Sequence, residues 1–433
     1  MTAEVYDEVP PNAGALIDAI RSLGYSLGDA VADIVDNSIT ADATHIDIDF
    51  YWDSANSWIR FTDNGKGMAA DVLKEAMRIG ARLPSETRAD NDLGRFGLGL
   101  KTASFSQCKR LTVQTRALGG ETLTRCWDLD RVTRTNRWEL LTQAPDARAA
   151  VLLDQVPNDS AGTVVLWEHL DRVLPSSLVP SSASVFLAEI SRVVDHLSTC
   201  FHRFLGPEGG LIIRVNGSEI EPWDPFCLDN DATLVYPDEQ LGDGRSATSV
   251  QAFVIPRSTL PPTVYDPSYR NLTPRQGFYV YRERRLLVAG GWLGLCRDHA
   301  DFALARLRVD ITNAVDREWK VDVRKSKVFP PATHATWLTG KALRLQETAR
   351  ATLRRRAVGV RESQPTAASP LWYVTSTDGV LAFRINRTSP LLAAPRLADI
   401  PREALESLLV ALETSLSPSL LTNSVVCQAN RRD

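Results

Sequence analysis

The order of apolar and polar positions predicts an N-terminal domain of mixed helices and strands. Through residues 11–41, apolar side chains recur at helical spacing, and a break at the sequence GYS divides the stretch into two helices, the second capped by Ser26. Residues 45–51 and 58–63 alternate apolar with polar side chains, as neighbouring strands do. A further helix is expected over residues 71–79.

A long loop follows this helix. Residues 80–100 are rich in Gly, Arg, Asp and Ser, and a loop of that length inside a compact domain is usually functional. Strands and turns are expected to about residue 168, and then a helix over about 182–204.

A second unit, rich in strands, is expected from about residue 207. The sequence LIIRVNGSEIEPWDPF predicts a strand, an Asn216-Gly217 hairpin turn and a return strand. Later elements are expected as strands at 248–255, 277–289 and 303–311 and as a helix over 334–357. A segment at 362–370 rich in Pro, Ser, Thr and Ala predicts a linker. These patterns divide the chain into residues 1–205, 206–335, a basic helix over 336–361, and a linker with a small α+β region over 362–433.

Composition and charge are those of an ordinary globular protein. The chain is 44% hydrophobic and 24% charged, with a net charge of −4, so nucleic-acid binding would require a local basic patch. Its six cysteines form no CxxC pair and its six histidines no HExxH pattern, which argues against a zinc site and a disulfide framework. No signal peptide and no apolar run of roughly 18 residues is seen, so we expect a cytoplasmic protein without a membrane segment.

The first stretch with candidate chemistry is ADIVDNS. Asp33 and Asn37 lie four residues apart at the margin of a helical apolar stripe that ends at Ser38. Residues at this spacing are stacked on a helix, so both polar groups would face a cavity at the edge of the core. A solvated helix face with a turn-capping Asn explains the pattern equally well.

The second stretch is FTDNGKGM, where a predicted strand runs into Asp63. Gly65 and Gly67 allow the backbone to turn tightly and to approach a ligand. A simple hairpin turn of Asp-Asn-Gly type is the alternative.

The third stretch is GRFGLGLKTAS, a glycine-rich loop that leads into a short predicted helix. Backbone amides at such a junction form an anion site, and Lys101 would add a positive charge for phosphate. The spacing is neither that of a Walker A loop nor that of a Rossmann fingerprint. A structural loop is the alternative.

In this order and spacing the three stretches resemble the GHKL ATPases, the superfamily of gyrase B, the ninety-kilodalton heat-shock chaperone, sensor histidine kinases, MutL and MORC proteins. AGTVVLWEHL, with Thr163 near its start, is similar to the fourth motif. The resemblance implies an α+β chain with a Bergerat-fold α/β sandwich, a transducer-like α+β domain and a small C-terminal α+β region. It also implies ATP and Mg2+ as cofactors.

The resemblance assigns roles to particular residues. Asn37 would hold Mg2+ against the triphosphate, Asp63 would accept the adenine amino group, and Thr163 would support that carboxylate. Residues 80–100 would close over the phosphates as a lid. The expected nucleotide contacts are Asn37, Asp63, Gly65, Gly67, Met68, Gly94, Gly97, Leu98, Gly99, Lys101, Thr102 and Thr163.

The catalytic base departs from the pattern of the family. Most members use glutamate four residues before the Asn, whereas this chain has Asp33, which is one methylene shorter. Because a base must come within hydrogen-bond reach of its water, we expect slow hydrolysis, with Asp36 as the rival carboxylate. In the transducer-like domain, Lys325 is the expected γ-phosphate lysine, with Lys327 and Lys320 as alternatives and an exposed basic turn as the plain explanation.

Residues 341–361 hold seven basic residues against one acidic. Such a helix could contact the phosphate backbone of DNA, and Arg282, Arg284 and Arg285 could extend the patch. A solvated helix or a surface for a protein partner explains it equally well.

The resemblance favours a slow ATPase that acts as an ATP-gated, dimerising clamp, most similar to bacterial MORC-like and MutL-like proteins. Its setting would be DNA processing or antiviral defence, with protein partners from the same system. The alternative is a nucleotide-binding scaffold or a chaperone-like protein with little hydrolysis. A histidine kinase is disfavoured because the short segment before the first motif contains no histidine.

Overall fold

A computed structural model of the chain gives the architecture. It describes residues 7, 9, 11–80, 99–157, 159–173, 182–242, 244, 247–259, 276–322, 328–357, 372–377, 380–387, 392 and 402–415. The chain forms two compact units, Met1–Leu353 and Arg354–Asp433. The first unit holds two domains, each built on its own sheet.

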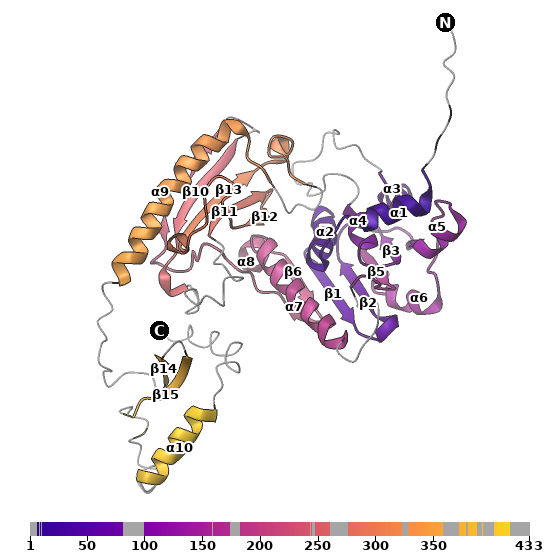
Figure 1. The fold of residues 1–433 in the computed structure, drawn as a ribbon. Coiled ribbons are helices and arrows are strands. Elements are labelled where there is room, and N and C mark those ends of the chain that lie inside the picture. Colours follow the sequence, from indigo (N-terminus) through magenta and orange to yellow (C-terminus); the bar gives the residue numbers. More distant parts are fainter. Residues whose placement is uncertain are drawn as a thin grey trace. The chain divides into compact units, whose positions relative to one another are not determined.

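The first domain is built on a seven-stranded mixed sheet in the order β4-β3-β5-β2-β1-β6-β7 (Figure 1). Its strands are β1 (His45–Tyr51), β2 (Trp58–Asp63), β3 (Arg110–Arg116), β4 (Leu123–Asp128), β5 (Gly162–Glu168), β6 (Ile212–Val215) and β7 (Ser218–Glu219). Neighbours are antiparallel except β1 and β6, which are parallel. The alternating patterns at 45–51 and 58–63 are confirmed as adjacent strands.

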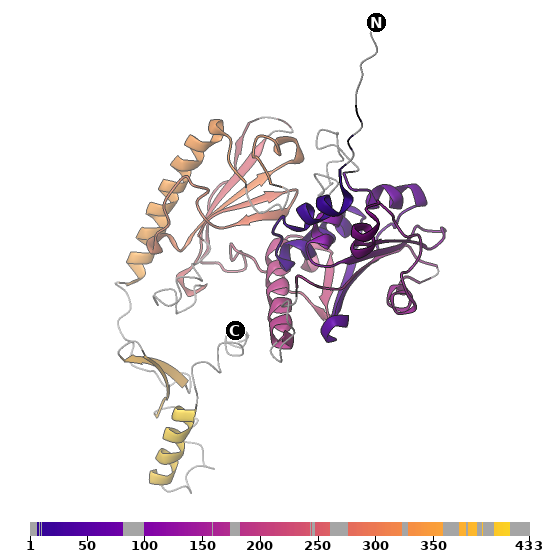
Figure 2. The ribbon, with the colours of Figure 1, turned by 45° about the vertical axis from the view of Figure 1, so that its right-hand side comes forward.

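The helices of this domain are α1 (Ala13–Arg21), α2 (Leu27–Thr40), α3 (Ala70–Met77), α4 (Gly99–Phe105), α5 (Leu129–Thr135), α6 (Ala147–Leu153), α7 (Ser182–Cys200) and the short α8 (Gly206–Gly209). Helices α1, α2, α4 and α7 supply side chains to the main core against one face of the sheet, and α7 runs along that side in the turned view of Figure 2. The predicted α/β sandwich is confirmed.

Strand β5 is buried on both faces of this sheet. Val165 and Trp167 belong to the main core, whereas Val164 and Leu166 pack with residues of α6 on the opposite face. Successive side chains of a strand point to opposite faces, so the apolar run of residues 164–167 is covered on both sides of the sheet.

The hairpin β6–β7 belongs to the first sheet. The predicted turn is present, with Asn216 and Gly217 at φ 47° and 80°, the geometry that favours an Asn-Gly pair. However, β6 pairs in parallel with β1. The sheet of the first domain therefore continues to Glu219, beyond the boundary expected at residue 205.

The second domain is a six-stranded sheet in the order β12-β11-β13-β10-β8, with β9 also paired to β10. Its strands are β8 (Leu234–Val235), β9 (Glu239–Leu241), β10 (Thr248–Val254), β11 (Gly277–Arg282), β12 (Arg285–Ala289) and β13 (Ala305–Ile311). The strands expected at 248–255, 277–289 and 303–311 are confirmed, the second as a pair of strands.

Helix α9 (Ala332–Ala357) covers one face of this second sheet (Figure 1). Leu338, Ala342, Leu345 and Ala349 are buried at the spacing of one helix face. An aromatic cluster that includes Phe226 fills the other face. This confirms an additional α+β domain after the first.

The second unit contains the hairpin β14 (Trp372–Thr377) and β15 (Val380–Ile385) and the helix α10 (Arg402–Ser415). The Glu413 carboxylate accepts a hydrogen bond of 2.7 Å from the backbone of Ile385, which joins helix and hairpin. The small α+β region is thus confirmed. Within the described helices, none combines the length and apolar character needed to cross a membrane.

Candidate functional site

Helix α2 places three polar side chains of the first motif in different surroundings. Ser26 caps the helix as predicted, accepting a hydrogen bond of 3.1 Å from the Asp29 backbone. Asp33 is buried at 3% exposure, Asp36 is buried at 1%, and Asn37 is exposed. Only Asn37 therefore reaches solvent directly, and Asp33 lies below it on the same side of the helix.

Asp33 contacts a tyrosine that sequence reasoning missed. The hydroxyl of Tyr25 donates a hydrogen bond of 3.1 Å to Asp33 Oδ2, and the hydroxyl of Thr102 lies 3.4 Å from the same phenol oxygen. A Cβ at Gly99 would lie 3.5 Å from Asp33 Oδ2. The start of α4 therefore packs against the Asp33 carboxylate. The sequence pattern identifies Tyr25 only as part of the GYS helix break.

Asp63 is fixed at the end of β2 by hydrogen bonds from three directions. Ser38 Oγ donates to Asp63 Oδ2 at 2.8 Å, and the backbone of Gly65 donates to Oδ1 at 2.9 Å. Burial raises the pKa of the Asp63 carboxyl, whereas the bonds from Gly65, Ser38 and the Thr163 backbone lower it. The first and second motifs therefore meet through Ser38, which the pattern had placed only in the apolar stripe.

Both glycines of the second motif are required by close packing. A Cβ at Gly65 would lie 2.8 Å from the carbonyl oxygen of Ala41. Gly67 has φ +63°, and a Cβ there would come within 1.9 Å of the Arg116 carbonyl oxygen, a contact that no side chain can make.

The fourth motif joins this turn through Thr115, a second residue that sequence reasoning missed. The Thr115 hydroxyl accepts from the Met68 backbone at 3.0 Å and lies 3.0 Å from the Thr163 hydroxyl. The support expected from Thr163 for Asp63 comes from its backbone, while its hydroxyl pairs with Thr115.

The third motif is only partly within the described residues. Lys101 is buried at 3% exposure, and its ammonium donates to the Ala76 carbonyl at 2.8 Å, next to the end of α3. Thr102 lies at the Tyr25 hydroxyl. The rest of the expected lid, including Gly94, Gly97 and Leu98, lies outside the described residues. So do Lys325 and Lys327, whereas Lys320 is exposed.

The rival carboxylate Asp36 faces the second domain. Arg285 of β12 donates from Nε to Asp36 Oδ1 at 3.2 Å, and the two side chains are only 6% and 1% exposed. The guanidinium also stacks on Phe201 at 4.6 Å. Burial acts to lower the pKa of Arg285, but the Asp36 carboxylate raises it above its ordinary value. Asp36 is therefore half of an ion pair between domains.

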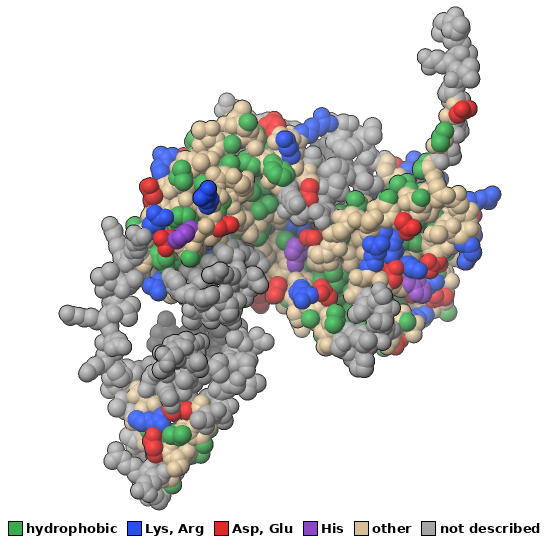
Figure 3. Space-filling model, in the orientation of Figure 1, with side chains coloured by type: hydrophobic (Ala, Val, Ile, Leu, Met, Phe, Trp, Pro, Cys, Tyr) green, Lys and Arg blue, Asp and Glu red, His purple; other side chains and the backbone are tan. Residues whose placement is uncertain are grey.

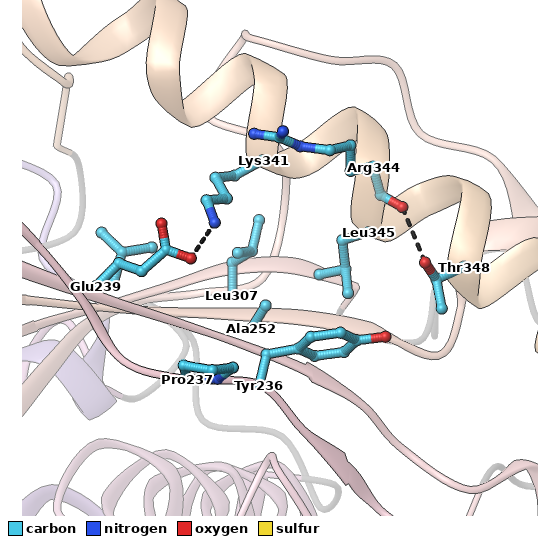
Figure 4. A pocket seen from close by; sticks show the side chains of 10 residues that line it. Tyr236, Pro237, Glu239, Ala252, Leu307, Lys341, Arg344, Leu345 and Thr348 are labelled. Atoms are coloured by element: carbon cyan, nitrogen blue, oxygen red, sulfur yellow. Dashed lines mark hydrogen bonds and ion pairs between the residues drawn. The ribbon is translucent and has the colours of Figure 1, made fainter.

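A pocket of about 240 Å3 lies between α9 and the second sheet (Figure 4). Tyr236, Leu307 and Leu345 give it apolar walls, and Lys341 pairs with Glu239 at its rim. It contains none of the residues predicted to contact nucleotide.

Two basic side chains of the expected patch form ion pairs within the chain. Lys341 pairs with Glu239, and Arg350 pairs with Asp301 at 3.3 Å. On the face drawn in Figure 3, basic and acidic side chains are interspersed.

Arg282 and Arg285 do not extend that patch, contrary to expectation. Arg282 is buried and contacts both carboxylate oxygens of Asp316, at 2.8 and 2.9 Å. Arg285 is buried against Asp36. Both arginines are thus used in ion pairs within the chain and are not available to a surface patch.

Comparison with known proteins agrees with this geometry. Residues 25–163 match the family described as histidine kinase-, DNA gyrase B-, and HSP90-like ATPase. The match begins at Tyr25 and ends at Thr163, so it contains the first three motifs and the start of the fourth. The chain is also 31% identical over 90 residues to ATPase morc-1 of Caenorhabditis elegans, which covers 21% of this chain and 10% of that relative. Residues 25–163 are therefore similar to the GHKL ATPase family, and the chain shares a short stretch of similarity with a MORC protein.

Proposed function

We propose that the chain binds ATP with Mg2+ at this site and hydrolyses it slowly. The observation that carries the proposal is the fixed carboxylate of Asp63. Ser38 and Gly65 hold its two oxygens at 2.8 and 2.9 Å, so the acceptor is oriented before any ligand arrives. A pre-oriented acceptor costs less ordering on binding, and an adenine amino group is the donor that the family resemblance assigns to it.

Asn37 fits the role of magnesium ligand. Its carboxamide is exposed on α2, one turn from the buried Asp33, and Mg2+ prefers oxygen ligands, often with one or two from protein and the rest from phosphates and water. Among the described residues, no group of three or more His, Cys, Asp or Glu could hold a metal ion by itself. Bound Mg2+ would neutralise charge on the triphosphate.

Asp33 is the proposed base for the attacking water. It lies one helical turn from Asn37, and α4, which follows the glycine-rich loop, packs beside it. Asp36 is a poorer base because Arg285 occupies its carboxylate. The short Asp33 side chain favours a slow enzyme, since proton transfer depends on hydrogen-bond reach.

Calorimetry with ATP and ADP tests the nucleotide site. We expect Asp63→Asn to abolish detectable binding, because the amide nitrogen presents a donor where an acceptor is needed. Asp47→Asn is the matched control, since this carboxylate on the neighbouring strand β1 is 48% exposed. Unchanged affinity in Asp63→Asn would refute the proposal.

Turnover distinguishes the enzyme from the alternative, a nucleotide-binding scaffold or chaperone-like protein. The slow enzyme should lose hydrolysis in Asp33→Ala and keep or gain it in Asp33→Glu. Absence of turnover in the original chain and in both variants, with ATP binding intact, would favour the scaffold.

We further propose that nucleotide acts on the second domain and on self-association. The Asp36–Arg285 pair connects the helix that carries Asn37 to β12, so a shift of α2 on ATP binding would be felt by the second domain. An ATP-dependent homodimer that clamps DNA fits this arrangement, with residues 341–361 as the proposed DNA contact and Lys325 as the proposed γ-phosphate lysine. Partner proteins in DNA processing or defence remain part of this proposal.

Light scattering with a nonhydrolysable ATP analogue tests the clamp. A monomer that stays a monomer in its presence would count against dimerisation, whatever the outcome of the binding experiments.

A further inference from the structure

We propose that Tyr25 positions Asp33 for catalysis, an inference that rests on the proposed ATPase function. By the resemblance described above, Asp33 stands at a position where the family usually has glutamate, and its side chain, one methylene shorter, reaches less far from α2. A short base has to be held at one orientation, because proton transfer requires the base and its water to be within about 3 Å. Tyr25 supplies the contact that can hold it.

The hydrogen bonds around Tyr25 run in one direction. The Thr102 hydroxyl lies 3.4 Å from the phenol oxygen and 3.4 Å from the Gly99 carbonyl oxygen, so the two acceptors share its proton, and the phenol donates to Asp33 Oδ2 at 3.1 Å. An ionised carboxylate only accepts, so the phenol proton points at Asp33. Burial, followed by the Asp33 charge, raises the pKa of Tyr25 above its ordinary value, and the phenol therefore keeps this proton at neutral pH.

Tyr25 is itself held from the side of α4. Its ring is buried at 8% exposure. Its backbone carbonyl accepts a bond of 3.3 Å from Gln107, a side chain that is 3% exposed. Thr102 is within α4 and Gln107 follows it closely, so both side chain and backbone of Tyr25 are tied to the element that ends the glycine-rich loop.

Gly99 confines Asp33 from a second direction. A side chain at that position would begin 3.5 Å from Asp33 Oδ2, so the start of α4 sits directly against the carboxylate. The orientation of Asp33 therefore depends on α4 twice, through Gly99 and through the chain from Thr102 to Tyr25.

Tyr25→Phe tests the inference by removing one oxygen and leaving the ring. A hydrogen bond to a charged group of this kind predicts a fall in kcat of about 10- to 100-fold, with ATP affinity by calorimetry within twofold of the original chain. Tyr51→Phe is the matched control, because Tyr51 is 49% exposed on β1 and should leave both quantities unchanged. Turnover of Tyr25→Phe within twofold of the original chain would overturn the inference.

A second measurement uses the protein without nucleotide. Urea unfolding of Tyr25→Phe, Asp33→Ala and the double variant forms a cycle that reports the direct contact between the two side chains. We expect the change in the unfolding equilibrium constant of the double variant to differ about tenfold from the product of the two single changes. Multiplicative effects would show that no contact of this strength exists and would overturn the positioning role.

The two proposals fail in different ways. If the original chain binds no ATP, the proposed function fails together with this inference. If the original chain hydrolyses ATP and Tyr25→Phe does so equally well, only the inference fails.

Discussion

Replacement of Arg285 by methionine should destabilise the first unit strongly. The substitution removes the guanidinium but retains an unbranched apolar side chain against Phe201. Arg285 and Asp36 are 6% and 1% exposed, and their closest atoms are 3.2 Å apart. A buried carboxylate that loses such a cation keeps most of its desolvation cost.

The expected magnitude follows from this burial. Removal of one partner from a buried ion pair costs about 3–5 kcal/mol. An exposed pair costs about 0–1 kcal/mol, and Lys66 with Asp42 is such a pair, at 3.3 Å with side chains 65% and 66% exposed. Lys66→Met is therefore the matched control.

Urea unfolding followed by circular dichroism measures both variants. The double variant Asp36→Asn with Arg285→Met should lose less than the sum of its two single changes, because each single change already removes the pair. The free energy of unfolding should separate Arg285→Met from Lys66→Met by at least about 2 kcal/mol.

Two results would refute this reasoning. Equal stability of Arg285→Met and Lys66→Met would show that the pair contributes no more than a surface contact. Additive losses in the double variant would show that Arg285 acts through contacts other than Asp36.

Three further predictions concern the turn at Gly67, the buried His202 and the magnesium ion. Gly67→Ala should abolish nucleotide binding and lower the urea midpoint, because its Cβ would meet the Arg116 carbonyl oxygen at 1.9 Å, whereas Gly80→Ala, at φ +70° with open space, should cost only about 1–2 kcal/mol. Burial lowers the pKa of His202 to about 4 from 6.5, so on acidification the unfolded chain takes up the proton before the folded chain does. The free energy of unfolding in urea should therefore fall as the pH drops below 6.5, and it should fall less between pH 6.5 and 5 in His202→Gln than in the original chain. Chelation of Mg2+ should stop the release of phosphate from ATP in a colorimetric assay, while ADP binding persists. Undiminished phosphate release with excess chelator would contradict the role given to Asn37.

Local signals were sufficient to predict the elements that carry the site. Ser26 caps α2 as predicted, because capping depends on a few adjacent residues. The strand leading to Asp63 and the turn at Gly67 follow from alternation and from the freedom of glycine. The family match over residues 25–163 supports the resemblance that these motifs suggested, whereas the roles of the individual residues stay predictions.

The partners of these residues could not be predicted, since they come from distant parts of the chain. Tyr25 is only 8 positions from Asp33, but Thr102 and Gln107, which contact Tyr25, lie 77 and 82 positions from it. Thr115 reaches Thr163 across neighbouring strands. The buried pair of Asp36 and Arg285 spans 249 positions, and neither periodicity nor propensity contains information at that separation.

The parallel pairing of β1 with β6 has a practical consequence for isolating the ATPase domain. A fragment that stopped at residue 205, where the pattern alone suggests a cut, would lack the strand that pairs with His45–Ile48. It would expose a bare strand edge, which favours aggregation, and would remove Ile213 and Ile220 from the core. A truncation that retains the chain through Ile220 keeps that edge covered and is the one to express.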